Sequence, residues 1–307
     1  MAPFLPGYRI GHESDRRGQT GCTVILPPSG TTAAVDIRGG APGTRETGVL
    51  APGNLVSEIH ALLFTGGSAF GLAAATGVVA YLRRRGVGFG LGPARVPIVA
   101  AAVLFDLAVG DPDAFPDEAM GMAACESARD GEVETGRVGA GCGATVGKLF
   151  GPARAARGGI GCATLELPEG ERLAALAAVN AFGDIVDPDR GVRIAGPSGV
   201  DPSFLSARAL WQDRLSESPL VGGHTTLVCV ATTIPFDAGA LKRVAIEAQD
   251  GLARAVRPAH TLVDGDVVFA LAPAGVSPPL GTRLRVGAAA AESTARAIVD
   301  AVAGSRV

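Results

Sequence analysis

The chain has 307 residues, of which 47% are hydrophobic and 19% charged, with a formal net charge of −3 at pH 7. This is the composition of a globular protein, and the scattered arginines argue against a basic surface for nucleic acid or an anionic membrane. No apolar run reaches the about 18 residues of a membrane-spanning helix. Residues 1–18 lack the basic-then-apolar order of a secretory signal, so we expect a cytoplasmic protein.

The cysteines also favour a reducing compartment. Their number, five, is odd, and none has the CxxC or Cys/His spacing of a metal site. We expect reduced, mostly buried thiols, and neither a metal nor a cofactor. They are Cys22, Cys125, Cys142, Cys162 and Cys229.

The N-terminal half predicts strands followed by a helix. Apolar runs bounded by turn residues predict strands over 20–27, 33–39 and 96–107. A short helical turn leading into a strand is expected over 55–67. The helix is expected over 68–86, with Ser68 as its N-cap and Gly86 as its stop.

The C-terminal third has the clearest pattern. An uninterrupted apolar run over 225–233 predicts a buried strand, and a helical apolar stripe follows over 237–258, capped by Asp237 and closed by Pro258. A further strand and a further helix are expected over 265–272 and 286–304. Strands buried on both faces between helices indicate a layered α/β fold, and nothing divides residues 1–307 into two domains.

Three glycine-rich stretches only approximate known motifs. "GGSAFG" (66–71) resembles a nucleophile elbow around Ser68, but its second glycine falls one residue late, so a turn beside a site is favoured. "GCGATVGKL" (141–149) lacks the Ser or Thr that a phosphate loop needs after its lysine. "GVGFGLG" (86–92) follows a helix instead of a strand, so we interpret it as a turn.

The acidic loop "GDIVDPDRG" (183–191) suggests a calcium site. Asp187, Asp189 and Gly191 fit the start of a calcium loop, but the closing glutamate is absent because position 198 is Ser. A solvated turn is the favoured interpretation.

Lys148 and Lys242 are the only lysines among 27 basic residues. Lys242 falls in a predicted helix and is expected to be a surface charge. Lys148 ends the glycine-rich run "GRVGAGCGATVGK", with few other polar groups nearby. Unlike arginine, a buried lysine can lose its proton, so Lys148 is a candidate site residue, with a snorkelling surface lysine as the alternative.

Thr225 opens the strand in "GGHTTLVCVATT". Cleavage of the His224–Thr225 bond would leave its α-amine, which titrates at about pH 8, beside its own hydroxyl. One residue would then supply both a nucleophile and its base. The alternative is an ordinary pair of threonines at a strand edge.

Taken together, five segments resemble one family. "RETGVLAPGNLVSEIHALLFTGGSAFGLAAATGV", "GRVGAGCGATVGK", "VNAFGDIVDP", "HTTLVCVATT" and "LARAVRPAHTLVDGDVVFAL" occur in the order found in DmpA-like self-processing N-terminal-nucleophile hydrolases. This family includes L-aminopeptidase/D-esterases, β-peptidyl aminopeptidases and 6-aminohexanoate-oligomer endohydrolases. The resemblance implies a four-layered αββα fold and self-cleavage into chains 1–224 and 225–307. It also implies a homo-oligomer, often a tetramer of processed pairs.

The resemblance also assigns roles to residues. It makes Thr225 the nucleophile and His224–Thr225 the cleavage site. Lys148 matches an active-site lysine, and Asn180 matches an asparagine that binds the substrate carbonyl or the oxyanion. Two further matches are acidic residues near the nucleophile, Asp264 and Asp266; the alternative for this pair is a metal site.

Two departures from the family pattern bear on function. Relatives of this branch have Asn before the nucleophilic threonine, where this chain has His224. The aminopeptidase branch uses a tyrosine hydroxyl, whereas this chain has only Tyr8 and Tyr81, and Phe105 cannot donate a hydrogen bond. From the Thr225 segment and the matched residues, our first hypothesis is a self-processing amidohydrolase or aminopeptidase that cleaves short peptides or amino-acid oligomers through an acyl-Thr225 intermediate. The alternatives are an uncleaved binding or scaffold protein and a serine hydrolase using Ser68.

Overall fold

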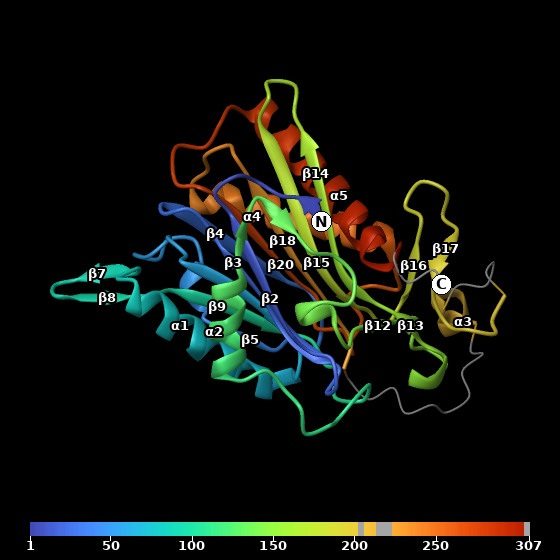
Figure 1. Cartoon of the computed structure of the whole chain (residues 1–307). Helices are drawn as coiled ribbons and strands as arrows, with labels where there is room; N and C mark the ends of the chain where they lie inside the picture. Colours follow the sequence, from blue (N-terminus) through green and yellow to red (C-terminus); the bar gives the residue numbers. More distant parts are fainter. Residues whose placement is uncertain (202–205, 213–222, 304–307) are drawn as a thin grey trace.

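The computed structural model describes residues 1–201, 206–212 and 223–303. Two β-sheets pack face to face, and helices cover the outer face of each (Figure 1). The expected four-layered αββα arrangement in a single domain is therefore confirmed.

The first sheet has six strands and is mostly antiparallel, with one parallel pair, β6–β9. Its order is β10 (Arg129–Asp130), β2 (Arg9–Asp15), β3 (Thr20–Leu26), β6 (Ala61–Thr65), β9 (Val99–Val103) and β5 (Thr44–Arg45).

The second sheet has five strands and carries the site. Its order is β14 (Gly159–Glu166), β15 (Arg172–Asn180), β18 (Thr225–Thr232), β20 (Val267–Pro273) and β4 (Thr31–Ile37). β18 lies in the middle of this sheet, antiparallel to β15 and parallel to β20.

Smaller elements complete the fold. The short strands are β1 (Ala2–Pro3) with β11 (Glu132–Val133), β12 (Thr145–Val146) with β13 (Ala156–Arg157), β7 (Phe89–Leu91) with β8 (Ala94–Val96), and the set β17 (Arg193–Ala195), β16 (Asp184–Val186) and β19 (Val256–Arg257). The short helices are the 3₁₀ turns η1 (Gly48–Leu50), η2 (Ser68–Ala73), η3 (Gly139–Gly141) and η4 (Pro152–Arg154), and α3 (Ser206–Trp211).

The alternation of side chains along each strand explains the layering. On β18, Leu227 and Cys229 face the other sheet, whereas Val228 and Val230 face the helices. Because successive side chains of a strand point to opposite faces, apolar residues at every position give a strand that is buried on both sides. This is why the run over 225–233 predicted a central strand.

The helices lie where their apolar stripes predict. α1 (Ala74–Arg84) and α2 (Glu118–Ser127) cover the first sheet, while α4 (Ala238–Ala255) and α5 (Leu280–Ala303) cover the second (Figure 1). Asp237 caps α4 as expected, since its side chain accepts from the Ala240 N–H at 2.9 Å. α4 and α5 approach so closely that a Cβ at Gly251 would collide with the carbonyl oxygen of Ala291.

Several predicted boundaries were wrong. Ser68 is not an N-cap: the cap position is Gly67, no side chain caps this helix, and residues 68–73 form a 3₁₀ turn before α1. Ser68 itself has a positive φ of 52°, a local turn geometry that propensity does not reveal. The strand predicted over 96–107 spans only Val99–Val103, and residues 55–60 contain no helical turn.

All five cysteines are free and buried, and burial raises the pKa of Cys125 and Cys162 to about 12. Within the described ranges, no helix is both long and apolar enough to cross a membrane.

Candidate active site

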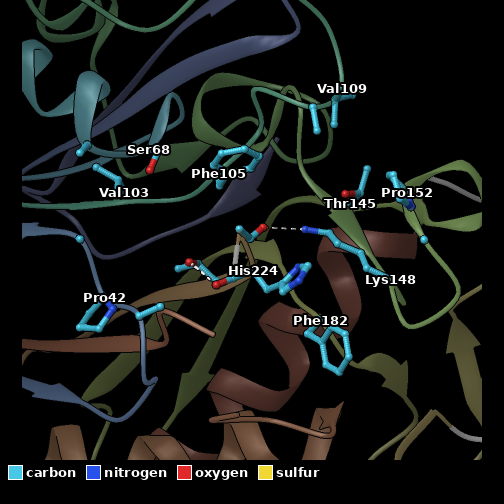
Figure 2. Close-up of a pocket in the computed structure, with 17 residues that line it drawn as sticks. Pro42, Ser68, Val103, Phe105, Val109, Thr145, Lys148, Pro152, Phe182 and His224 are labelled. Atoms are coloured by element: carbon cyan, nitrogen blue, oxygen red, sulfur yellow. Dashed lines mark hydrogen bonds between the residues drawn. The ribbon is translucent and has the colours of Figure 1, made fainter. Parts of the chain in front are cut away.

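A cleft of about 890 Å³ opens where β18 begins, with loops of the first sheet on one side and residues 145–152 on the other (Figure 2). Thr225, Lys148 and His224 line it. Most other lining residues are apolar or glycine, including Phe105 and Phe182. The cleft therefore gathers residues that are far apart in the sequence.

Thr225 and Asn180 are direct partners in the sheet. Thr225 begins β18, Asn180 ends β15, and the two face each other in the antiparallel register. Both are buried, with exposed fractions of 5% and 0%. The ends of these two strands thus place the Asn180 amide beside Thr225, which lines the cleft.

The peptide bond before Thr225 has two donors on its carbonyl. The Thr225 hydroxyl donates to the His224 oxygen at 2.5 Å, and the Gly265 N–H donates to the same oxygen at 2.7 Å. A Cβ on residue 265 would lie 2.7 Å from Thr225 Oγ1, so only glycine allows this approach. Gly265 was not among the residues singled out from the sequence, because its contribution is a backbone N–H.

Lys148 is partly buried and points to the same place. Its Nζ donates to Asn180 Oδ1 at 2.8 Å, to Asn180 O at 3.0 Å and to Gly223 O at 3.2 Å. Removal from water lowers the pKa of Lys148 to about 7, although Asp264 and Asp106 act in the opposite direction. The snorkelling alternative is wrong: the ammonium is turned inward.

The Asn180 amide is fully used. Its Oδ1 accepts from Lys148 and from the Thr145 N–H at 2.9 Å. Its Nδ2 donates to Phe105 O at 2.9 Å and to Gly223 O at 3.1 Å. These bonds fix the orientation of the amide, so its NH₂ group points to the backbone carbonyl of Gly223, two residues before Thr225.

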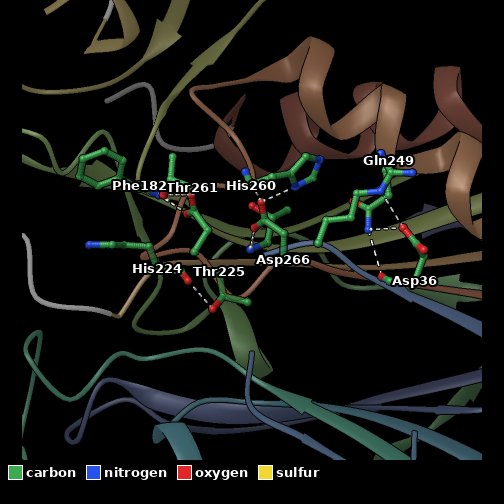
Figure 3. A network of polar contacts seen from close by, with 11 residues as sticks. Asp36, Phe182, His224, Thr225, Gln249, His260, Thr261 and Asp266 are labelled. Atoms are coloured by element: carbon green, nitrogen blue, oxygen red, sulfur yellow. Dashed lines mark hydrogen bonds and ion pairs between the residues drawn. The ribbon is translucent and has the colours of Figure 1, made fainter. Parts of the chain in front are cut away.

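The two carboxylates lie behind Thr225 and are both 1% exposed. Asp264 accepts from Thr261, through its N–H at 2.9 Å and its hydroxyl at 2.5 Å, and from the Phe182 N–H at 3.3 Å. Asp266 accepts from the Thr226 N–H at 2.8 Å, which ties it to the residue after Thr225 (Figure 3). Burial first, and then the neighbouring Asp266, raise the pKa of Asp264 to about 6.

His260 completes this network and was missed by the sequence analysis. Its N–H and its Nδ1 both lie 2.9 Å from Asp266 Oδ2 (Figure 3). Since protein donors already occupy every oxygen of Asp264 and Asp266, this geometry does not favour the metal-site alternative. In the described part of the chain, no group of three or more His, Cys, Asp and Glu side chains is arranged to hold a metal.

The His224 side chain lies in the cleft against Phe182. The ring centroids are 5.0 Å apart and the planes are tilted by 47°. Burial and then the Lys148 charge lower the pKa of His224 to about 3, so the ring is uncharged at neutral pH. This contact joins residues 42 positions apart in the sequence, which the local pattern could not predict.

The other candidates fall outside the cluster or lack partners. Ser68 lines the far side of the cleft, but no hydrogen bond joins its Oγ to a described histidine, lysine or carboxylate. Tyr8 and Tyr81 are not among the residues that line the cleft, whereas Phe105 is. The tyrosine of the aminopeptidase branch therefore has no counterpart in the described cleft.

The structure also tests the sequence interpretations of the acidic loop around Asp187 and of Lys242. Asp187 accepts from the N–H groups of Asp189 and Arg190 at 3.0 Å each, which is the hydrogen bonding of a turn. Lys242 is not an isolated surface charge: its Nζ donates to Asp36 Oδ1 at 2.8 Å, and its side chain is 31% exposed. The pairing was not predictable because Asp36 lies 206 residues away.

Comparison with known sequences identifies related proteins over nearly the whole chain. A profile of peptidase family S58 matches residues 5–306. An uncharacterized aminopeptidase of Mycobacterium leprae is 42% identical over 305 residues, covering 92% of this chain and 82% of that protein. A 6-aminohexanoate-oligomer endohydrolase of Kocuria sp. is 33% identical over 275 residues, covering 87% of this chain and 73% of that enzyme.

Solved structures share the fold. The L-aminopeptidase D-Ala-esterase/amidase from Ochrobactrum anthropi, described as a variant of the Ntn hydrolase fold, aligns with a TM-score of 0.74 and 20% identity. A Burkholderia sp. β-aminopeptidase aligns with a TM-score of 0.69 and 22% identity. Each alignment covers 97% of this chain and 84% of the other.

Proposed function

The chain belongs to peptidase family S58, whose members hydrolyse peptide or amide bonds, and from this premise we propose that Thr225 becomes its nucleophile after self-cleavage of the His224–Thr225 bond. The observation that carries the proposal is the pair of donors on the His224 carbonyl, at 2.5 Å from Thr225 Oγ1 and 2.7 Å from the Gly265 N–H. The nucleophilic oxygen and a backbone donor thus meet at the bond to be cut.

Self-cleavage proceeds by acyl transfer. Thr225 Oγ attacks the carbonyl carbon of His224 while its proton is removed, and the Gly265 N–H stabilises the oxyanion that forms. The C–N bond then breaks, its nitrogen takes up a proton and becomes the α-amine of Thr225, and His224 is left as an ester on Oγ. One water molecule hydrolyses this ester, which releases the His224 carboxylate and restores the hydroxyl.

Hydrolysis of a substrate repeats the same steps. The free α-amine of Thr225 now serves as the base, because such amines titrate at about pH 8. Lys148, with its pKa of about 7, exists in both protonation states at neutral pH, and its charged form favours an alkoxide on Thr225. Asn180 Nδ2 donates to the Gly223 carbonyl at 3.1 Å, and in this proposal it binds the corresponding carbonyl of a substrate, the one that precedes the acyl residue.

Asp264 and Asp266 are positioning residues in this proposal. Asp266 holds the Thr226 N–H and Asp264 holds the Thr261 hydroxyl, so both fix the backbone that presents Thr225. Substrates in this proposal are short peptides or amino-acid oligomers, cleaved without a cofactor.

Intact mass and N-terminal sequencing test the proposal directly. The purified protein should give fragments of residues 1–224 and 225–307, the smaller one beginning Thr-Thr-Leu-Val. Thr225→Ala should remain a single chain and show no turnover, because it lacks the nucleophilic oxygen. Full activity of Thr225→Ala would refute the proposal, and a wild-type chain that stays uncut would support the binding-protein alternative.

A further inference from the structure

The uncut chain displays the first acyl group that its own site binds. In self-cleavage the carbonyl of His224 becomes an ester on Thr225 Oγ, and in catalysis the acyl carbonyl of a substrate becomes the same kind of ester on the same oxygen. The side chain and the preceding amide of His224 therefore mark where the acyl residue of a substrate lies. This reasoning rests on the proposed function.

The His224 side chain, which marks the side chain of the acyl residue, lies in a place that suits a flat ring. The His224 imidazole lies 5.0 Å from the Phe182 ring, and Phe182 is only 2% exposed and packs with Leu149. A buried aromatic partner of this kind is fixed before a ligand arrives, and tilted ring pairs are favourable beyond their buried area. His224 Nδ1 has no hydrogen-bond partner among the described residues, so none of them selects for an imidazole over a phenyl ring.

The preceding amide is also recognised. The Gly223 carbonyl accepts from Lys148 Nζ at 3.2 Å and from Asn180 Nδ2 at 3.1 Å. A substrate whose acyl residue has a free α-amine lacks the preceding carbonyl that corresponds to Gly223 O. Its α-ammonium would instead lie near the Lys148 side chain. Among the described residues that line the cleft, none is a carboxylate that could pair with such an ammonium.

We propose that the mature site selects acyl residues with an aromatic or imidazole ring and an acylated nitrogen. Phe182 receives the ring, and Lys148 with Asn180 receives the carbonyl that precedes it. Figure 2 shows Phe182 and Lys148 on either side of His224. The enzyme accordingly cleaves after an internal or N-blocked ring-bearing residue and does not remove free N-terminal residues.

Four p-nitroanilides test both halves of the proposal on the self-cleaved protein. They are acetyl-Gly-His-, acetyl-Gly-Phe-, acetyl-Gly-Ala- and unblocked His-p-nitroanilide. The two blocked ring substrates should exceed the blocked alanine substrate in kcat/KM by about 5- to 10-fold. The blocked histidine substrate should exceed the unblocked one by at least about 10-fold, because the unblocked substrate lacks the carbonyl that accepts from Lys148 and Asn180.

The variant Phe182→Leu tests whether the Phe182 ring causes the preference for substrates with a ring-bearing acyl residue. Leucine keeps an apolar side chain packed with Leu149 but removes the aromatic face, so the ratio of the Phe to the Ala substrate should fall to about one. Self-cleavage of this variant, followed by mass, reports whether it folds. A ratio that stays at the wild-type value in a cleaved variant would overturn the role of Phe182.

The outcomes separate this proposal from the one it rests on. A protein that cuts before Thr225 but prefers the unblocked substrate, or hydrolyses the alanine and ring substrates equally, supports the nucleophile and overturns the substrate class. A protein whose Thr225→Ala variant still cleaves these anilides overturns the nucleophile itself.

Discussion

The two lysines of the chain lie in opposite electrostatic settings. Lys242, on α4, donates to Asp36 at 2.8 Å, and Arg38 binds the other oxygen of the same carboxylate at 2.8 Å. Lys148 donates only to carbonyl and amide oxygens, and no carboxylate in the described residues lies within ion-pair distance of it. An ammonium that is removed from water and surrounded by neutral dipoles releases its proton more easily than one in water. The first lysine is suited to stability and the second to chemistry.

The largest effect should come from replacing the unpaired lysine. Lys148→Met removes a proton-exchanging cation from the cleft, so turnover of an amide substrate should fall by at least about 100-fold. Lys148→Arg should not restore it, since arginine cannot lose its proton at neutral pH. The matched control is Lys242→Met, and equal losses in both variants would show that the two lysines do not differ in role.

The pH dependence of stability provides a second test, made in the uncut Thr225→Ala chain. The folded pKa of Lys148, about 7, lies below its value of about 10.4 in an unfolded chain. Between these values the unfolded chain binds more protons, so the free energy of unfolding should rise with pH, by up to about 1.4 kcal/mol per unit.

Urea unfolding at pH 7 and pH 9.5 measures this contribution. The rise should be smaller when Lys148→Met is added to Thr225→Ala, because the methionine does not titrate. Parallel curves for the two chains would contradict the lowered pKa.

The paired lysine should affect stability alone. Lys242→Met leaves Asp36, whose side chain is 12% exposed, with one cation instead of two. In the Thr225→Ala background the free energy of unfolding should fall by about 1–2 kcal/mol, as for loss of a charged hydrogen bond. In the cleavable chain kcat/KM should change by less than about twofold, and Lys242→Arg should recover most of the stability.

Ser68→Ala should have the smallest effect. Ser68 lies in the same cleft as Lys148 but has no basic partner among the described side chains, so processing and turnover should both change by less than about twofold. Loss of turnover in a correctly cleaved Ser68→Ala protein would instead place the chemistry at the other side of the cleft.

The sequence predicted the layers better than the site. Apolar runs and a helical stripe predicted β18, α4 and α5, because burial on both faces or on one face leaves a periodic pattern. The pairing of Asn180 with Thr225 was foreseeable only through the family resemblance, since strand register is not encoded locally.

Other parts of the site left no readable signal. Gly265 contributes a backbone N–H, which every residue except proline possesses, and its need for glycine appears only when Thr225 Oγ1 is 2.7 Å from its missing Cβ. The His224–Phe182 contact and the His260–Asp266 bonds depend on how β15, β18 and the loop before β20 meet. Ser68 was misread as a cap because side-chain propensity does not report a positive φ.

The position of β18 determines what self-cleavage does to refolding. The second sheet would be shared between two chains, with β14, β15 and β4 from residues 1–224 and β18 and β20 from residues 225–307. The proposed cut lies before the first residue of β18, so the pairing of this strand with β15 and β20 would be kept in the folded protein. Once unfolded, however, the two pieces must meet again by diffusion, and recovery becomes bimolecular and dependent on concentration. The persistence of the mature protein is then governed by how slowly it unfolds rather than by an equilibrium to which it can return.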